Sequence, residues 1–192
     1  MNTIIVHFSD IHFRENWHEN HNVVFQALFD DLAKQIELKP TSNYYAIFSG
    51  DIVQAGEKAE SYSEFSKIFD KKLNELGIDR SKRICVPGNH DVSRSTILKS
   101  IFDHEGIVAQ NLSENDFNNY ARSHNDVFRN KFDNYIQFQN EFTEINPFGE
   151  SICGGGFDLD DNISVYCLNT AFFLAEESHI QAMERYLIVK GF

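Results

Sequence analysis

Three short polar motifs carry side chains of the types that bind metal ions. They are "SDIH" with Asp10 and His12, "SGD" with Asp51, and "PGNHD" with Asn89, His90 and Asp91. Carboxylates and imidazoles are good ligands for Mn, Fe or Zn, and an Asn side chain offers an acceptable carbonyl oxygen. Taken singly, each motif could be an ordinary polar loop. Together, and in this order, the three motifs predict a metal site.

Each motif follows an apolar segment that is expected to be a strand. These segments begin the stretches 3–8, 44–51 and 83–91. In an extended chain, residues two apart point the same way, so Asp10 and His12 would aim at one point. Gly50 and Gly88 would allow tight turns and close backbone approach beside the predicted ligands.

Two predicted helices, over 21–38 and 60–77, separate the predicted strands, because their apolar residues recur at helical spacing. The order strand, helix, strand, helix, strand predicts an α/β fold with a parallel sheet covered by helices. Ligands of such sheets bind beyond the carboxyl ends of the strands. The three motifs should therefore converge.

The rest of the chain gives weaker signals. Residues 100–150 form a helical insertion with a helix expected at 131–142, which either shapes a substrate pocket or packs on the flank. The glycines and acids of 153–162 are interpreted as a turn between two strands, the second at 163–169. The charged stretch 70–83 is interpreted as a solvated helix face and loop.

Composition is typical of one globular domain over residues 1–192, with 42% hydrophobic residues and 18 Phe. A net charge of −12 argues against a general electrostatic grip on nucleic acid, unless bound divalent ions add positive charge locally. Cys85, Cys153 and Cys167 form no C-x-x-C pair, which favours a reducing cytoplasm. No segment reaches the length of a membrane span or has the pattern of a signal peptide, so no membrane partner is expected.

The motifs "DIH", "GD" and "PGNHD" resemble, in order, the first three signature blocks of the calcineurin-like metallophosphoesterases. The resemblance covers residues 1–100 and again the strand "VYCLNT". It implies a β-sandwich flanked by helices, in α-β-β-α layers, possessing a two-metal site at one edge.

The resemblance also assigns roles to residues. Asp10 and His12 would bind the first metal, Asp51 would bridge both metals, and Asn89 would bind the second and contact substrate. His90 would face the scissile phosphate as general acid or charge stabiliser, and Asp91 would support the loop. Two divalent ions, Mn first with Fe, Zn or Ni as alternatives, can clamp a phosphate and ionise a water between them. An imidazole such as His90 can then protonate the leaving alkoxide.

The segment after "GD" departs from the family's protein-phosphatase branch. That branch has a GDxxDRG pattern, whereas this chain has Gln54 and Ala55 at the places of the acid and the arginine. A protein-phosphatase role is therefore disfavoured. The expected substrate is a phosphodiester, in a nucleotide or in nucleic acid.

The later histidine and the final G-H-x-H block of the family do not occur in this sequence. Two interpretations stay open: the N-terminal part of a longer enzyme, or a shortened, catalytically impaired binding or regulatory module. If the chain is part of a longer enzyme, a longer C-terminal region or a partner chain would complete the site. If it is a shortened module, the second metal position would stay empty.

The other histidines and Arg94 stand outside the three motifs, and none of them is expected to be a metal ligand. His7 is expected to be a satisfied core or interface residue of the first strand. His18 and His21 follow the first motif closely enough to reach substrate, and Arg94 could reach a phosphate from the rim. The remaining histidines, in the insertion and before the last predicted helix, are His104, His124 and His179.

Overall fold

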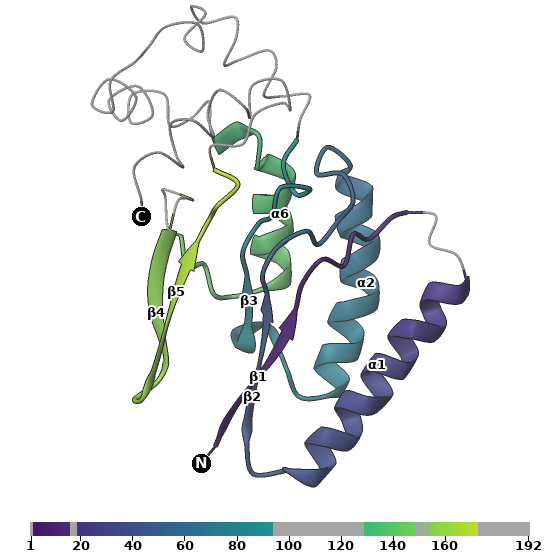
Figure 1. The fold of residues 1–192 in the computed structure, drawn as a ribbon, viewed down its shortest axis with the longest axis vertical. Helices are drawn as coiled ribbons and strands as arrows, with labels where there is room; N and C mark the ends of the chain where they lie inside the picture. Colours follow the sequence, from purple (N-terminus) through teal and green to yellow (C-terminus); the bar gives the residue numbers. More distant parts are fainter. Residues whose placement is uncertain (1, 16–18, 94–128, 149–151, 153, 173–192) are drawn as a thin grey trace, which may run out of the picture.

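A computed structural model describes residues 2–15, 19–93, 129–148, 152 and 154–172 (Figure 1). Its centre is a three-stranded sheet that is parallel, as the sequence predicts, with its strands in the order β1-β2-β3. The elements up to the third strand are β1 (Thr3–Phe8), α1 (Glu19–Leu38), β2 (Asn43–Phe48), α2 (Ala59–Glu75), the 3-10 turn η1 (Arg80–Lys82) and β3 (Arg83–Cys85).

The register of the sheet brings the ends of its strands level. Phe8 is paired with Phe48, and Phe48 is paired with Cys85. Because the strands are parallel, the three loops that follow them leave the sheet at one edge. That edge is where the polar motifs begin.

Alternation along β2 sends every second side chain into the core. Tyr44, Ala46 and Phe48 are buried. The Phe48 ring meets the α2 ring of Phe65, with ring centroids 5.9 Å apart, in an edge-on geometry that aromatic pairs favour. The sheet is therefore anchored to α2 by aromatic packing.

The two long helices cover the same face of the sheet (Figure 1). Four apolar residues of α2, at helical spacing, are buried as predicted: Tyr62, Phe65, Phe69 and Leu73. On α1, Phe29 and Leu32 are buried, whereas Leu28 is 38% exposed. Among the described helices, none has both the length and the apolar character needed to cross a membrane.

A β-hairpin, β4 (Gly154–Asp160) and β5 (Ile163–Leu168), lies on the opposite side of the sheet from α1 and α2 (Figure 1). The interpretation of 153–162 as a turn is wrong, because most of it is β4. Glycine is depleted in strands, so the composition was misleading. At Gly155 a side chain would overlap the carbonyl oxygen of Pro147, which explains why this strand position tolerates only glycine.

Hydrogen bonds tie the hairpin to the sheet. The Tyr45 hydroxyl donates to the Leu159 carbonyl at 3.1 Å, and the Thr3 hydroxyl donates to the Asp160 carboxylate at 2.5 Å. The mixed α/β class is thus confirmed. Within the described residues no helix covers the outer face of the hairpin, so the four-layered sandwich stays a prediction.

The helix expected at 131–142 is present as α6 (Asp133–Phe142). Its Phe138 and Phe142 rings lie 5.7 and 5.5 Å from the Phe65 ring of α2, so this helix packs into the core. Residues 100–128 and 149–150 of the predicted insertion lie outside the described residues.

The stretch 70–83 is not simply solvated, because its last residue is buried. The Arg83 side chain is 0% exposed and donates to Asp70 of α2 at 2.5 Å, and to the Phe142 carbonyl at the end of α6 at 3.2 Å. Charged residues are rarely buried without partners. Here the partners come from two helices, which the local sequence pattern does not reveal.

Candidate metal centre

The loops after β1 and β2 run alongside each other and are joined by backbone hydrogen bonds. The His12 amide donates to the Asp51 carbonyl at 2.8 Å, and the Phe13 amide donates to the Ile52 carbonyl at 2.9 Å. The first two motifs are therefore held together by the main chain itself. The convergence predicted from the strand order is present.

The backbone of three predicted ligands is left-handed. Asp10, His12 and Asp51 have φ values of 54°, 50° and 52°. Because β1 ends at Phe8, the expectation that strand alternation aims Asp10 and His12 is wrong, and the left-handed turns aim them instead. Non-glycine residues seldom adopt this conformation, which costs energy and tends to cluster at functional sites.

The two glycines expected beside the ligands are required where they stand. Gly50 has a φ of 114°, which disfavours any side chain. A side chain at Gly88 would overlap the Asp51 carboxylate and the Asp51 amide nitrogen. The second and third loops can therefore approach each other only through glycine.

His12 faces two carboxylates at a distance that suits a shared cation. Its Nε2 lies 3.9 Å from an oxygen of Asp10 and 3.9 Å from an oxygen of Asp51, beyond hydrogen-bond length. Two ligands that each lie about 2.1 Å from one ion can be no more than about 4.2 Å apart. Each of the two carboxylates is therefore close enough to His12 to share one divalent ion with it.

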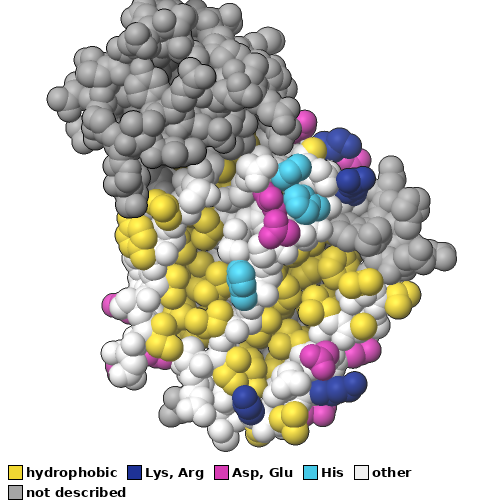
Figure 2. All heavy atoms as spheres, viewed as in Figure 1, with side chains coloured by type: hydrophobic (Ala, Val, Ile, Leu, Met, Phe, Trp, Pro, Cys, Tyr) yellow, Lys and Arg dark blue, Asp and Glu magenta, His cyan; other side chains and the backbone are white. Residues whose placement is uncertain are grey.

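His90 adjoins this group. One ligand atom each from His12, Asp51 and His90 lie within 4.8 Å of one another, and the two imidazole rings meet edge-on with centroids 4.6 Å apart. The Nδ1 atom of His12 is buried and has no hydrogen-bond partner among the described residues. Figure 2 shows His and acidic side chains gathered at one end of the described surface, above a band of apolar side chains.

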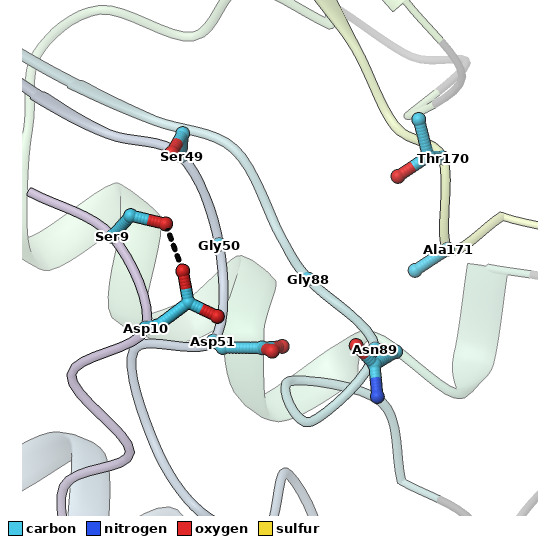
Figure 3. Close-up of a pocket in the computed structure, with 9 residues that line it drawn as sticks. All are labelled: Ser9, Asp10, Ser49, Gly50, Asp51, Gly88, Asn89, Thr170 and Ala171. Atoms are coloured by element: carbon cyan, nitrogen blue, oxygen red, sulfur yellow. Dashed lines mark hydrogen bonds between the residues drawn. The ribbon is translucent and has the colours of Figure 1, made fainter.

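A cavity of about 330 Å³ opens beside the ligands (Figure 3). The Asp51 carboxylate lies between Asp10 and Asn89, and the Ser9 hydroxyl donates to the Asp10 carboxylate. Asn89 is exposed at the cavity edge, as a substrate contact or a ligand would need to be. The cavity is lined by Ser9, Asp10, Ser49, Gly50, Asp51, Gly88, Asn89, Thr170 and Ala171.

The two oxygens of Asp51 are directed to different partners. One accepts the His90 amide hydrogen at 2.8 Å, and the other is the oxygen that faces His12. The side chain is 13% exposed, so its orientation is set by these neighbours. Asp51 thus links all three loops.

Asp91 supports the third loop, as predicted. Its buried carboxylate accepts hydrogen bonds from the amides of Ile52, Val53 and Gly88 and from the Tyr62 hydroxyl. Burial nevertheless raises the pKa of Asp91 to about 6, because desolvation of the charge outweighs these hydrogen bonds. Asp91 acts on the site through the loop and does not face the cavity.

Gln54 is the partner of His90, and the sequence alone did not show this. The Nδ1 atom of His90 lies 2.9 Å from the Gln54 carbonyl oxygen and 3.2 Å from the Gln54 side-chain nitrogen. In the sequence, Gln54 stands where the protein-phosphatase branch has an acidic residue. The structure shows that the glutamine at this position contacts the His90 ring.

Three residues outside the predicted motifs, His7, Thr170 and Ala171, lie at or beside the cavity. His7 is exposed, not a core residue, and its Nε2 lies 2.7 Å from the Ser49 hydroxyl at the cavity. Thr170 and Ala171 line the cavity just after β5. Thr170 is the last residue of "VYCLNT", and Ala171 had no sequence signal beyond its place after a strand.

His18, Arg94, His104, His124 and His179 lie outside the described residues, as does the side chain of His21.

The family profile described as calcineurin-like phosphoesterase matches residues 3–185 of the chain. The match includes all three motifs and every described strand. A search of curated proteins gave no match.

Proposed function

Because the chain belongs to the calcineurin-like phosphoesterase family, we propose that it hydrolyses phosphodiesters in nucleotides or nucleic acid. The family implies metal-dependent phosphoester hydrolysis. One observation carries the proposal for this chain: donor atoms of His12, Asp51 and His90 lie within 4.8 Å of one another at the ends of three parallel strands.

Asp10, His12 and Asp51 would hold the first divalent ion, with Mn²⁺ as the proposed native ion. Asp51 and Asn89 would contribute to a second, whose further ligands would come from residues outside the described part or from another chain. When bound, such ions supply charge neutralisation at the phosphate and lower the pKa of water.

The protein's own residues orient the reacting groups. Asp51 is fixed by the His90 amide, so its second oxygen stays directed toward His12. The contacts of His90 with Gln54 engage Nδ1 and leave Nε2 as the nitrogen that can exchange a proton with substrate. Asn89 would donate to a phosphate oxygen from the cavity edge.

The preference for diesters rests on the segment after Asp51. Gln54 and Ala55 stand where the protein-phosphatase branch has an acid and an arginine. Without that arginine, the site would bind a doubly charged phosphate monoester less tightly. A diester carries one negative charge and needs less compensation.

The test is hydrolysis of bis-p-nitrophenyl phosphate and p-nitrophenyl phosphate with added Mn²⁺. We expect the diester to be hydrolysed faster than the monoester. Asp51→Asn should lower kcat/KM by about 100-fold or more, since even supporting residues of metal sites contribute about 10- to 100-fold. Asp161→Asn, at an exposed acid of the hairpin turn, is the matched control and should keep wild-type activity.

Equal turnover by wild type and Asp51→Asn would overturn the proposal. Binding of Mn²⁺ without turnover of either substrate would favour the binding or regulatory module instead. Faster hydrolysis of the monoester would contradict the diester preference alone.

A further inference from the structure

Arg14 and His90 of the candidate site both contact the side chain of Gln54. Its guanidinium donates to the side-chain oxygen of Gln54 at 3.1 Å. The side-chain nitrogen of the same Gln54 lies 3.2 Å from Nδ1 of His90. A single amide therefore separates the guanidinium from the imidazole.

The backbone holds this arrangement in place. The Gln54 amide donates to the Phe13 carbonyl at 2.9 Å, which fixes Gln54 beside the residue that precedes Arg14. Phe13 and Val53 also form a parallel β-bridge. Arg14 is thus presented by the first loop, the loop that carries Asp10 and His12.

The charge of Arg14 is left uncompensated by its neighbour. Gln54 is neutral, and among the described residues no carboxylate lies within 4.0 Å of the guanidinium. Nearby Lys58, by contrast, is paired with Glu15 at 3.1 Å. In a chain with a net charge of −12, an exposed arginine beside the site and without an acidic partner is suited to an anionic ligand.

We propose that Arg14 binds the phosphate next to the scissile one, so that the site prefers substrates with at least two linked phosphodiesters. An arginine fork can bind phosphate oxygens in pairs while Gln54 holds one of its nitrogens. The proposal rests on the phosphodiesterase function proposed above. Gln54 is the positioning residue that places Arg14 and His90 relative to each other.

The test is binding of a fluorescein-labelled, phosphorothioate-linked thymidine pentamer, measured by anisotropy with Mn²⁺ at several salt concentrations. Arg14→Ala should weaken Kd about tenfold or more, and the slope of log Kd against log salt should fall by about 0.7. Arg14→Lys should keep the slope but lose part of the affinity, because lysine lacks the fork. Lys58→Ala is the matched control and should change Kd less than twofold.

Kinetics locate the contact. Arg14→Ala should raise KM for a thymidine trinucleotide, which has two linked phosphodiesters. This fold-increase should be about ten times the fold-increase in KM for bis-p-nitrophenyl phosphate. Equal losses on both substrates would place Arg14 at the scissile phosphate and overturn the proposal. So would an unchanged Kd and salt slope in Arg14→Ala, or no binding of the pentamer by the wild-type protein. Absence of hydrolysis by the wild type would refute the proposed function, while the binding series still decides the role of Arg14.

Discussion

At the scale of single residues, Asp91 shows how the site is held without touching the cavity. Its carboxylate joins the loops after β2 and β3 through amides of Ile52 and Gly88, and reaches α2 through the Tyr62 hydroxyl. The same burial that makes these bonds strong disfavours the charge. Asp91 thus holds the two loops together, while the ionisation of its buried carboxyl group lowers the stability of the fold as pH rises.

This cost predicts a pH dependence of stability in the protein without metal. Burial raises the pKa of Asp91 from its ordinary value of 3.8 to about 6, so between these two pH values the folded state binds more protons than the unfolded state. Its contribution to stability is therefore full below about pH 4 and is lost as pH rises through 6. A shift of this size corresponds to about 3 kcal/mol.

Urea unfolding in EDTA at pH 4 to 7 measures this effect. Asp91→Asn should remove part of the fall in the free energy of unfolding toward pH 7. The amide accepts fewer hydrogen bonds than the carboxylate, so the variant is less stable at every pH. The slope of stability against pH is therefore the readout, not the absolute stability. Asp161→Asn, at an exposed acid, should leave the profile as in wild type. If Asp91→Asn keeps the wild-type profile, the raised pKa is refuted.

At the scale of elements, buried polar contacts fix how the helices pack behind the site. Arg83 of β3 donates to the Ile78 carbonyl before η1 and to the Phe142 carbonyl at the end of α6. It also pairs with Asp70 of α2. One side chain thus joins α2, β3 and α6, and β3 leads directly into the "PGNHD" loop.

Removing this side chain should destabilise the whole fold. Arg83→Ala leaves the Ile78 and Phe142 carbonyls without these donors in a buried place, and each orphaned group costs about 1–3 kcal/mol. With two such groups, we expect a loss of about 2–6 kcal/mol in the free energy of unfolding, measured with urea.

The exposed pair Lys67–Glu64 on α2, with its atoms 2.6 Å apart, offers the comparison. Lys67→Ala should cost less than about 1 kcal/mol, because exposed ion pairs contribute little. Similar losses in the two variants would show that burial of Arg83 does not matter.

At the scale of the whole molecule, the candidate metal centre couples loops from three strands. Asp10 and His12 follow β1, Asp51 follows β2, and His90 follows β3. The left-handed backbone at Asp10, His12 and Asp51 costs energy, and the carboxylates of Asp10 and Asp51, each 3.9 Å from Nε2 of His12, bring two negative charges near each other. A bound ion would compensate both and stabilise the fold globally.

Addition of Mn²⁺ should therefore raise Tm, and EDTA should reverse the rise. At a free concentration of 100 times Kd, the gain is about 2.7 kcal/mol. Asp51→Asn should lose most of the gain, while Asp161→Asn should keep it. An equal rise in both variants would mean that the ion binds elsewhere.

The sequence by itself determined the alternation of strands and helices along the chain, the parallel sheet and the meeting of the three motifs at its edge. These depend on local patterns: an apolar run followed by "SDIH", "SGD" or "PGNHD", and helical spacing between the runs. Because parallel strands end at one edge, convergence of the motifs follows from order alone. The buried α2 residues followed in the same way from their spacing.

Only the tertiary structure decided how those residues meet. The left-handed aim of Asp10 and His12 depends on hydrogen bonds to the second loop, and the partnership of Gln54 with His90 joins residues 36 positions apart. The burial of Arg83 depends on α2 and α6 together. Such contacts form between distant segments, so no local pattern encodes them, and they determine which neighbour each functional side chain has.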